Sequence, residues 1–200
     1  MDPMQPKPRH APYALKIARW HNHINHVQAP KNIRAWLTET GSLTAKLIAH
    51  STNFRIQRIY QQRAYCWFDE FEAIGLHKVS KVVAREVLLR CDGIPAVYAH
   101  TVTPINSNAS QWPLFKTLGE KSLGTTLFQD PQVKRGRLQF ARLSPNHPAM
   151  QRARLLTQHE IDAKFDQPLF ARRSLFFRRG GVMLVTELFL PNIAQLTEKT

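Results

Sequence analysis

A strand, a glycine turn and a second strand follow one another in the middle of the chain, and this pattern most constrains the fold. Val79–Cys91 is rich in β-branched and other apolar residues, and Ile94–Val102 repeats that composition. Asp92-Gly93, which lies between them, is a sequence that two-residue hairpin turns favour. Because Pro95 has no backbone N–H, we expect the returning strand to start at a bulge or at a sheet edge.

A second hairpin is predicted at the C-terminal end of the chain. Leu169–Arg179 and Val182–Leu190 have strand-like composition, Gly180-Gly181 lies between them, and Pro191 ends the second strand. Hairpins pair antiparallel strands, and the chain shows no regular alternation of strand and helix. The sequence therefore predicts a mostly antiparallel sheet.

Helical spacing of apolar residues and further β-rich runs supply the other elements. Ser42 can cap one helix, whose apolar face would hold Leu43, Leu47 and Ile48. We expect the α+β class, with a six-stranded, mostly antiparallel sheet flanked by helices. The other predicted segments are a helix near Ile33–Leu37, a strand at Asn53–Trp67, helices at about Gln111–Leu118 and from Ser122, a strand at Val133–Leu143 and a helix at Pro148–His159.

The charge of the chain favours an anionic partner. It carries 28 Lys and Arg residues against 14 Asp and Glu residues, a formal net charge of +14 at pH 7. The partner could be nucleic acid, an anionic membrane surface or a small acid, although a basic surface that only keeps the protein soluble explains the charge equally well. Between Lys134 and Arg179 the basic residues are spread along strand-like segments, so no basic tail is evident.

The first 30 residues are Pro-rich and polar, and they predict a poorly ordered N-terminal extension. The remaining residues, 31–200, are enough for one folded domain with one core. His21, His23 and His26 could bind a metal ion. A solvated polar turn is the favoured interpretation, because no cysteine or carboxylate completes a set of ligands.

Cysteine usage and hydropathy predict a cytoplasmic protein. Cys66 and Cys91 have no CxxC spacing, and we expect two reduced thiols. The N-terminus lacks the apolar segment of a signal peptide. The longest apolar run is far shorter than the roughly 20 residues that span a bilayer, so no stable membrane insertion is expected.

Two charged residues stand alone in apolar rows of predicted strands. Because strand side chains alternate between two faces, Glu187 shares a face only with apolar residues of the last strand, and Arg85 does so in the strand before Asp92. Burying an unpaired charge is costly, so each residue must pair, change its protonation or face a cavity. They could pair with each other or with Glu86 and Arg173. A functional pocket is the alternative.

Sequence motifs of several large enzyme classes are absent. The chain has no GxGxxG, Walker A, HExxH or GxSxG sequence, and no cluster with the spacing of a zinc site. If the protein is an enzyme, we expect it to work without a metal or a nucleotide.

Four short segments carry a family resemblance. They are REVLLRCDG (85–93), LGEKSLG (118–124, followed by LF at 127–128), ARRS (171–174) and TELFLP (186–191). Their order and spacing resemble those of the chorismate pyruvate-lyase family over about residues 33–191. The last segment together with the first is the most specific part of the resemblance.

The resemblance implies a six-stranded antiparallel sheet with flanking helices and a lyase that converts chorismate to 4-hydroxybenzoate and pyruvate. This is the first committed step of ubiquinone synthesis in many bacteria. No cofactor is implied. We expect a monomer whose partners are these small molecules and not nucleic acid.

Matched residue by residue, the resemblance assigns four site residues. Arg85 would hold the ring carboxylate, and Glu187 would lie at the hydroxyl end of the ring, so both are predicted catalytic residues. Leu43 and Leu123 would also contact the ligand, Leu123 through its backbone. We expect Glu187 to position and polarise the substrate, with a general base as the second choice. Residues 37–48 and 106–112 are the predicted covers of the pocket.

Two other classes of function stay open. Effector-binding domains of some transcription regulators share a related fold and bind small molecules without turnover, but the first 30 residues are too short and Pro-rich for a winged helix. A basic nucleic-acid-binding protein would interleave exposed aromatics with arginines. Phe170, Phe176 and Phe177, which lie among arginines, give a hint of that pattern, although an amphipathic strand pair explains it equally well.

Overall fold

The protein is an α+β domain built on one antiparallel sheet, in a computed structural model that describes residues 17–107, 110–113, 115, 118, 122–161 and 165–196. The strand order is β1-β2-β3-β7-β6-β4, and β5 also pairs with β6. The strands are β1 (Phe54–Tyr65), β2 (Lys81–Cys91), β3 (Ile94–Pro104), β4 (Lys134–Arg135), β5 (Gln139–Leu143), β6 (Leu169–Arg178) and β7 (Gly181–Phe189).

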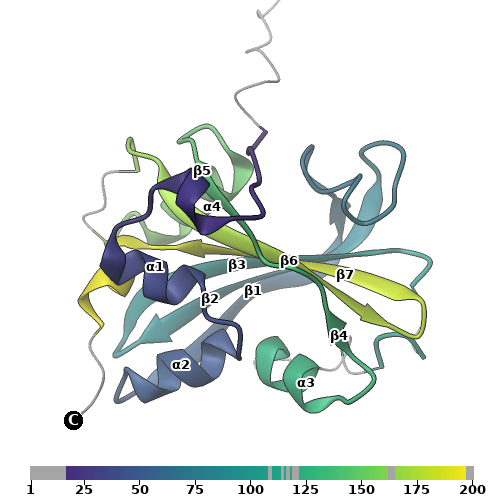
Figure 1. The fold of residues 1–200 in the computed structure, drawn as a ribbon, viewed down its shortest axis with the longest axis horizontal. Coiled ribbons are helices and arrows are strands. Elements are labelled where there is room, and N and C mark those ends of the chain that lie inside the picture. Colours follow the sequence, from purple (N-terminus) through teal and green to yellow (C-terminus); the bar gives the residue numbers. More distant parts are fainter. Residues whose placement is uncertain are drawn as a thin grey trace, which may run out of the picture.

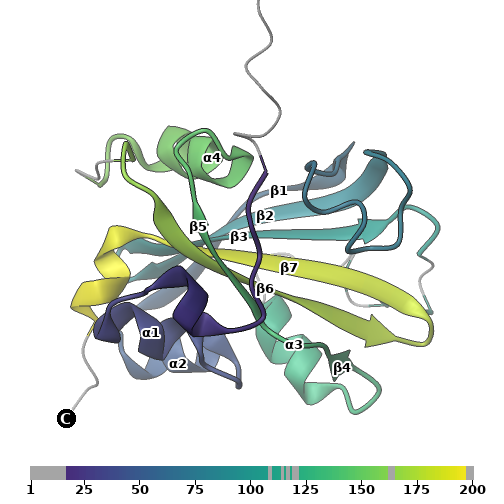
Figure 2. The ribbon, with the colours of Figure 1, turned by 45° about the horizontal axis from the view of Figure 1, so that its top comes forward.

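Helices cover both faces of this sheet (Figures 1 and 2). On one face, Val87 and Leu89 of β2 pack against Leu37 and Leu47. The side chains that alternate with them pack against the other helical layer, where Met150 is buried. The helices are η2 (Ile24–Val27), α1 (Lys31–Leu37), α2 (Leu43–Ala49), α3 (Leu123–Gln129), α4 (Pro148–Thr157) and η3 (Pro191–Gln195). Figure 1 shows α2 and α3 on one side of the strands and α4 on the other.

Both predicted hairpins are present. Asp92 and Gly93 have φ values of 52° and 82°, which a two-residue turn of the left-handed kind requires. In the second hairpin the turn residues are Arg179 and Gly180, one position earlier than predicted, and Gly181 already belongs to β7. The predicted irregularity near Pro95 is a bulge, because the register shifts between Leu89 and Arg90 of the partner strand.

Two predicted elements differ from the structure. The predicted strand at Val133–Leu143 consists of two short strands, β4 and β5, so the sheet has seven strands instead of six. The interruption falls at Gly136, whose N–H donates to the carbonyl oxygen of Leu175 at 2.7 Å. In the predicted helix at Gln111–Leu118, the described residues form turns and bends, and residues 114, 116 and 117 lie outside the described ranges.

Residues 17–30 pack against the domain, although the sequence predicted no packed element there; residues 1–16 lie outside the described part of the chain. Val27 and Ala29 are buried in the same core cluster as Leu37. His21 and Phe140 exchange two backbone hydrogen bonds of 2.8 Å, so this segment pairs with the outer edge of β5. A few small buried apolar residues and one backbone pairing with an edge strand therefore attach residues 17–30 to the domain, although the composition of this segment predicts no packed element.

The predicted N-cap of the helix after Ser42 is confirmed, but its predicted apolar face is only partly right. The Ser42 hydroxyl accepts a hydrogen bond from the backbone N–H of Ala45. Leu47 is fully buried, whereas Ile48 is 51% exposed and Thr44 takes the inward position instead. No helix in the described ranges has both the length and the apolar composition needed to cross a membrane.

Leu47 and Ile48 therefore offer a matched pair of variants in one helix. We expect Leu47→Ala to lower the free energy of unfolding by about 2–5 kcal/mol, because it leaves a cavity in the core. Ile48→Ala should change it by less than about 0.5 kcal/mol. Urea unfolding followed by circular dichroism measures both values. Equal losses in the two variants would contradict this packing of α2.

Candidate active site

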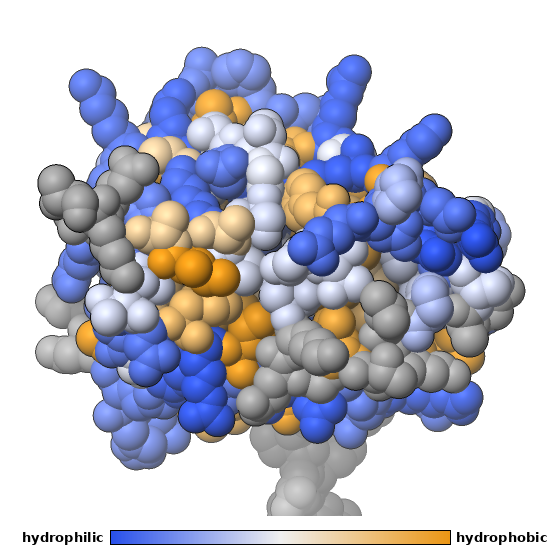
Figure 3. Space-filling model, turned by 90° about the horizontal axis from the view of Figure 1, so that it is seen from below, coloured by the Kyte–Doolittle hydropathy of each residue, from blue (hydrophilic) through white to orange (hydrophobic). Residues whose placement is uncertain are grey.

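A cavity lies between one face of the sheet and the first residues of α2 and α3. Its empty space measures about 630 Å³, the opening to solvent included. Figure 3 views this side of the molecule and shows apolar residues near the middle of the face between hydrophilic margins. The described lining residues are Leu43, Thr44, Ile56, Arg85, Val87, Leu89, Ala99, Thr101, Ser122, Leu123, Gly124, Leu127, Phe128, Arg135, Arg172, Ser174, Phe176, Val185 and Glu187.

All four residues that the sequence analysis assigned to the site line this cavity. Arg85 comes from β2, Glu187 from β7, and Leu43 and Leu123 are the first residues of α2 and α3. The fold thus brings together four segments that are far apart in the sequence. What each residue does there stays a prediction.

The sheet register sets the spacing between Arg85 and Glu187. Thr101 of β3 pairs with Arg85 on one side and with Val185 on the other, so Arg85 is aligned with a residue two positions from Glu187. Two strand spacings and two residues along a strand separate the two Cα atoms by roughly 12 Å. Between them the floor carries Ala99 and Thr101. These side chains are small, so they take up little of the space above this part of the sheet.

The Arg85 guanidinium is held in a buried position. The side chain is 2% exposed, and its Nη1 donates to Oε1 of Gln61 at 2.9 Å. The Gln61 amide in turn donates to the carbonyl oxygen of Phe115 at 2.6 Å. Burial, and to a smaller extent the charge of Arg58, lower the pKa of Arg85 to about 10. A carboxylate placed beside it would favour its charged form.

Glu187 pairs with Arg172, its direct neighbour across β6 and β7. The Nε atom of Arg172 donates to Oε2 of Glu187 at 2.5 Å. The Nη1 atom of the same guanidinium reaches three carbonyl oxygens at the end of α1, those of Trp36, Leu37 and Glu39, at 3.1, 3.3 and 2.7 Å. One arginine therefore fixes the orientation of Glu187 and caps the C-terminal end of α1.

The pairing partners considered from the sequence, Glu86 and Arg173, both belong to the opposite face of the sheet. Glu86 accepts three hydrogen bonds from Arg152 of α4, the shortest at 2.7 Å. Arg173 donates to the carbonyl oxygen of Asp69 at 2.6 Å. Alternation along β6 separates Arg172 from Arg173, but only the register with β7 decides which of them meets Glu187.

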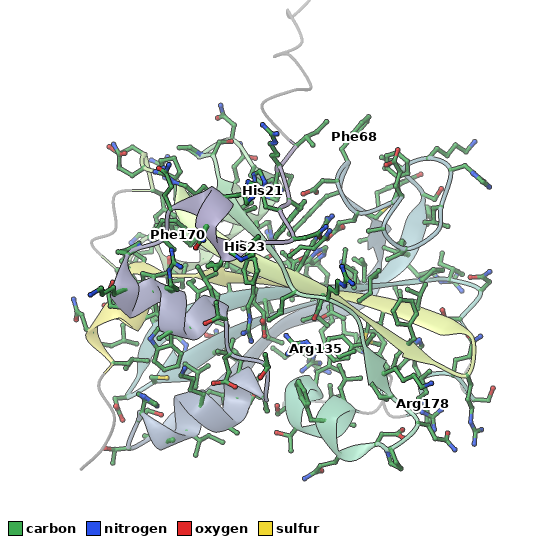
Figure 4. The ribbon with its side chains drawn as sticks, in the orientation of Figure 1. His21, His23, Phe68, Arg135, Phe170 and Arg178 are labelled. Carbon is green, nitrogen blue, oxygen red and sulfur yellow. The ribbon has the colours of Figure 1, made fainter. Side chains whose placement is uncertain are left out.

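Arg135 is a site residue that the sequence analysis missed. Its Nε donates to Oγ of Ser174 and its Nη1 to the carbonyl oxygen of Thr40, both at 2.9 Å. The guanidinium carbon lies 5.4 Å from the ring centre of Phe128 and 5.6 Å from that of Phe176. Burial, followed by the charge of Arg172, lowers the pKa of Arg135. Figure 4 shows the side chain between the strands and α3.

The first residues of α2 and α3 meet over the cavity. The Ser122 hydroxyl, which caps α3, donates to Oγ1 of Thr44 at 2.8 Å. A Cβ atom on Gly124 would lie 3.2 Å from Oγ1 of Thr44, so a glycine permits this close approach. The predicted cover at residues 37–48 thus supplies Leu43 and Thr44 to the lining. The described residues of the other predicted cover, 106–112, supply none, and α3 occupies that side instead.

The described residues contain no group of three or more His, Cys, Asp or Glu side chains that could hold a metal ion. His21 and His26 stack with ring centres 5.2 Å apart, and Nδ1 of His23 accepts a hydrogen bond from the backbone of Asn25. These histidines lie in the N-terminal segment and do not line the cavity.

Fold and cavity together define an α+β domain with a pocket whose described lining includes three arginines and one glutamate. Similar folds occur in solved structures: the effector domain of PhnF from Mycobacterium smegmatis aligns with a TM-score of 0.51 at 16% identity, covering 77% of this chain and 91% of that one. The full-length PhnF structure aligns with a TM-score of 0.51, also at 16% identity, over 78% of this chain and 66% of that one. At such identity the likeness concerns the fold alone.

Sequence comparison is more specific. A model of the chorismate lyase family matches residues 14–199. A probable chorismate pyruvate-lyase from Cupriavidus metallidurans is 44% identical over 178 residues, which are 88% of this chain and 81% of the relative. One from Nitrosomonas eutropha is 41% identical over 171 residues, 85% of this chain and 93% of the relative. The chain belongs to the chorismate lyase family and is an enzyme of that family.

The buried pair yields a stability prediction. Arg172→Met should lower the free energy of unfolding by about 3–5 kcal/mol, because it leaves Glu187 without its partner in a largely buried site. The double variant Arg172→Met/Glu187→Gln should recover part of that loss, since no unpaired charge remains. Urea unfolding at pH 7 compares them, with Arg137→Met as the control at an exposed arginine. A double variant no more stable than Arg172→Met would contradict the account.

Proposed function

We propose that the protein is a chorismate pyruvate-lyase that converts chorismate to 4-hydroxybenzoate and pyruvate. In this proposal it acts in the cytoplasm as a monomer without a cofactor, and the reaction is the first committed step of ubiquinone synthesis. The observation that carries the proposal is the charge inside the cavity, together with the family membership. The names of the relatives support the lyase reaction.

The charged lining residues leave the cavity with a positive surplus. Among the described lining residues, Arg85, Arg135 and Arg172 contribute three positive charges and Glu187 one negative charge, which leaves two positive charges. Chorismate carries two carboxylates, one on the ring and one on the enolpyruvyl arm. A dianion of this kind would balance the surplus, and the basic surface of the protein would favour its approach.

The positions of the charges suit one orientation of the ring. Arg85 can grip the ring carboxylate with two parallel hydrogen bonds, as a planar guanidinium does. Glu187 can then accept a hydrogen bond from the ring hydroxyl at the opposite end. Arg172 already holds one of its oxygens, Oε2, which fixes the direction of the carboxylate. Leu43 and Leu123 would contact the ring from the helical side.

The reaction needs few catalytic groups. The ether bond between the ring carbon and the enolpyruvyl oxygen breaks, and the neighbouring hydroxyl-bearing carbon loses its hydrogen. The electrons of that C–H bond complete the aromatic ring, and a proton added to the methylene carbon of the departing arm gives the methyl group of pyruvate. Aromatisation supplies the driving force, so the protein has to orient the substrate, stabilise charge and exclude water. We assign positioning and polarisation of the hydroxyl to Glu187.

A direct assay tests this proposal. Purified protein mixed with chorismate in the presence of a chelator should form 4-hydroxybenzoate and pyruvate in equal amounts, measured by chromatography and by a lactate dehydrogenase assay. The chelator should leave the rate unchanged. Tight binding of chorismate without either product would indicate a ligand-binding domain and contradict the proposed lyase.

A direct contact between Arg85 and the substrate can be distinguished from the effect of removing any one positive charge from the protein. Arg85→Ala should raise KM for chorismate by roughly 10- to 100-fold, because a charge-assisted contact with the ring carboxylate is lost. Arg63→Ala removes an exposed arginine from the adjacent strand β1 and serves as the control, with KM expected within about twofold of the unchanged protein. Steady-state kinetics give both values. An unchanged KM in Arg85→Ala would refute the contact.

A further inference from the structure

Arg135 lies on the shortest strand of the sheet and points into the cavity. β4 contains only Lys134 and Arg135, which pair with Phe177 and Phe176 of β6. Because adjacent strand residues point to opposite faces, Arg135 shares the cavity side with Phe176, while Lys134 is exposed on the other side. The two residues carry the same charge and differ in the face that they present.

The hydrogen bonds of Arg135 leave one edge of its guanidinium available. Nε and Nη1 donate to Ser174 and to the carbonyl oxygen of Thr40, and no hydrogen bond among the described residues uses Nη2. No ion pair among the described residues includes Arg135, whereas Arg172 has Glu187 as its counterion. The lowered pKa of Arg135 fits a charge whose burial is not offset by a contacting carboxylate.

The sheet register places this guanidinium opposite Arg85. Arg85, Thr101, Val185 and Ser174 form one cross-strand row from β2 to β6. The Arg135 guanidinium is bonded to the Ser174 hydroxyl at the far end of this row. Three strand spacings separate the Cα atoms of Arg85 and Ser174 by roughly 14 Å, a span that one guanidinium side chain and a substituted ring can fill.

Three anchors therefore surround the open floor of the cavity. Arg85 and the Arg135 guanidinium lie at the two ends of the row, and Glu187 lies two residues to one side of it. Chorismate has three matching groups: the ring carboxylate, the hydroxyl opposite to it, and the enolpyruvyl carboxylate beside the hydroxyl. With the first on Arg85 and the second at Glu187, the arm extends toward β6 and β4.

We propose that Arg135 binds the enolpyruvyl carboxylate of the substrate through the Nη2 edge of its guanidinium. This assignment rests on the proposed function. It makes Arg135 a residue that distinguishes the substrate from the ring product, because the arm departs as pyruvate and 4-hydroxybenzoate retains nothing for Arg135 to bind. The contacts with Phe128, Phe176 and Ser174 hold the guanidinium in place before the substrate arrives.

A pair of stable ligands tests the assignment without turnover. 4-Hydroxybenzoate has only the ring carboxylate, and 3-(carboxymethoxy)-4-hydroxybenzoate adds a second carboxylate at the position of the arm. In calorimetric titrations, Arg135→Ala should weaken binding of the second ligand by roughly 10- to 100-fold and that of 4-hydroxybenzoate by less than about threefold. Arg135→Lys should restore part of the lost affinity, since it keeps the charge without the planar edge.

Lys134→Ala is the matched control, because it removes one positive charge from the same strand on the exposed side. It should change neither affinity by more than about twofold. Equal weakening of both ligands by Arg135→Ala would show a structural role, and an unchanged affinity for the dicarboxylate would show that Arg135 makes no contact with it. Either result overturns the assignment of Arg135. If the unchanged protein still converts chorismate, the proposed function stands. If the unchanged protein binds neither ligand, the proposed function fails as well.

Discussion

The ion pair between Arg172 and Glu187 is the interaction on which the site depends. It joins neighbouring strands at the centre of the sheet, and the same guanidinium bonds three carbonyl oxygens at the end of α1. The Glu187 side chain is only 16% exposed, and a carboxylate withdrawn from water in this way is costly without such a partner. The pair stabilises the charged form of Glu187 in the cavity and fixes the orientation of its carboxylate. Through Arg172 it also ties the segment that leads into α2 to the sheet.

The remaining charges of the cavity are arranged around a floor of small side chains. Ala99, Thr101 and Ser174 leave open space where larger residues would fill the sheet face. Arg85 and Arg135 lie at opposite ends of that space. Arg135 also donates a hydrogen bond to the carbonyl oxygen of Thr40, in the connection between α1 and α2. A dianion bound at Arg135 would thus be linked to the sheet and, through this arginine, to the segment between α1 and α2.

Sequence reasoning reaches the parts of this arrangement that depend on local pattern. The turn at Asp92-Gly93 supports the antiparallel fold class, and strand alternation marks Arg85 and Glu187 as single charges in apolar rows. Only the family resemblance predicts that the two charges share one pocket. These patterns do not reveal Arg172 as the partner, because that depends on the register of two strands. Nor do they reveal Arg135, which stands in a basic stretch and gains its role from contacts with residues distant in the sequence.

The position of a bound ring tests the account most directly. A crystal structure of the protein with 4-hydroxybenzoate should show the ring above Ala99, its carboxylate within hydrogen-bond distance of the Arg85 guanidinium and its hydroxyl within hydrogen-bond distance of Glu187. A ring bound with its carboxylate at the Glu187 end, or bound outside this cavity, would contradict the claim that these two residues hold the two ends of one substrate.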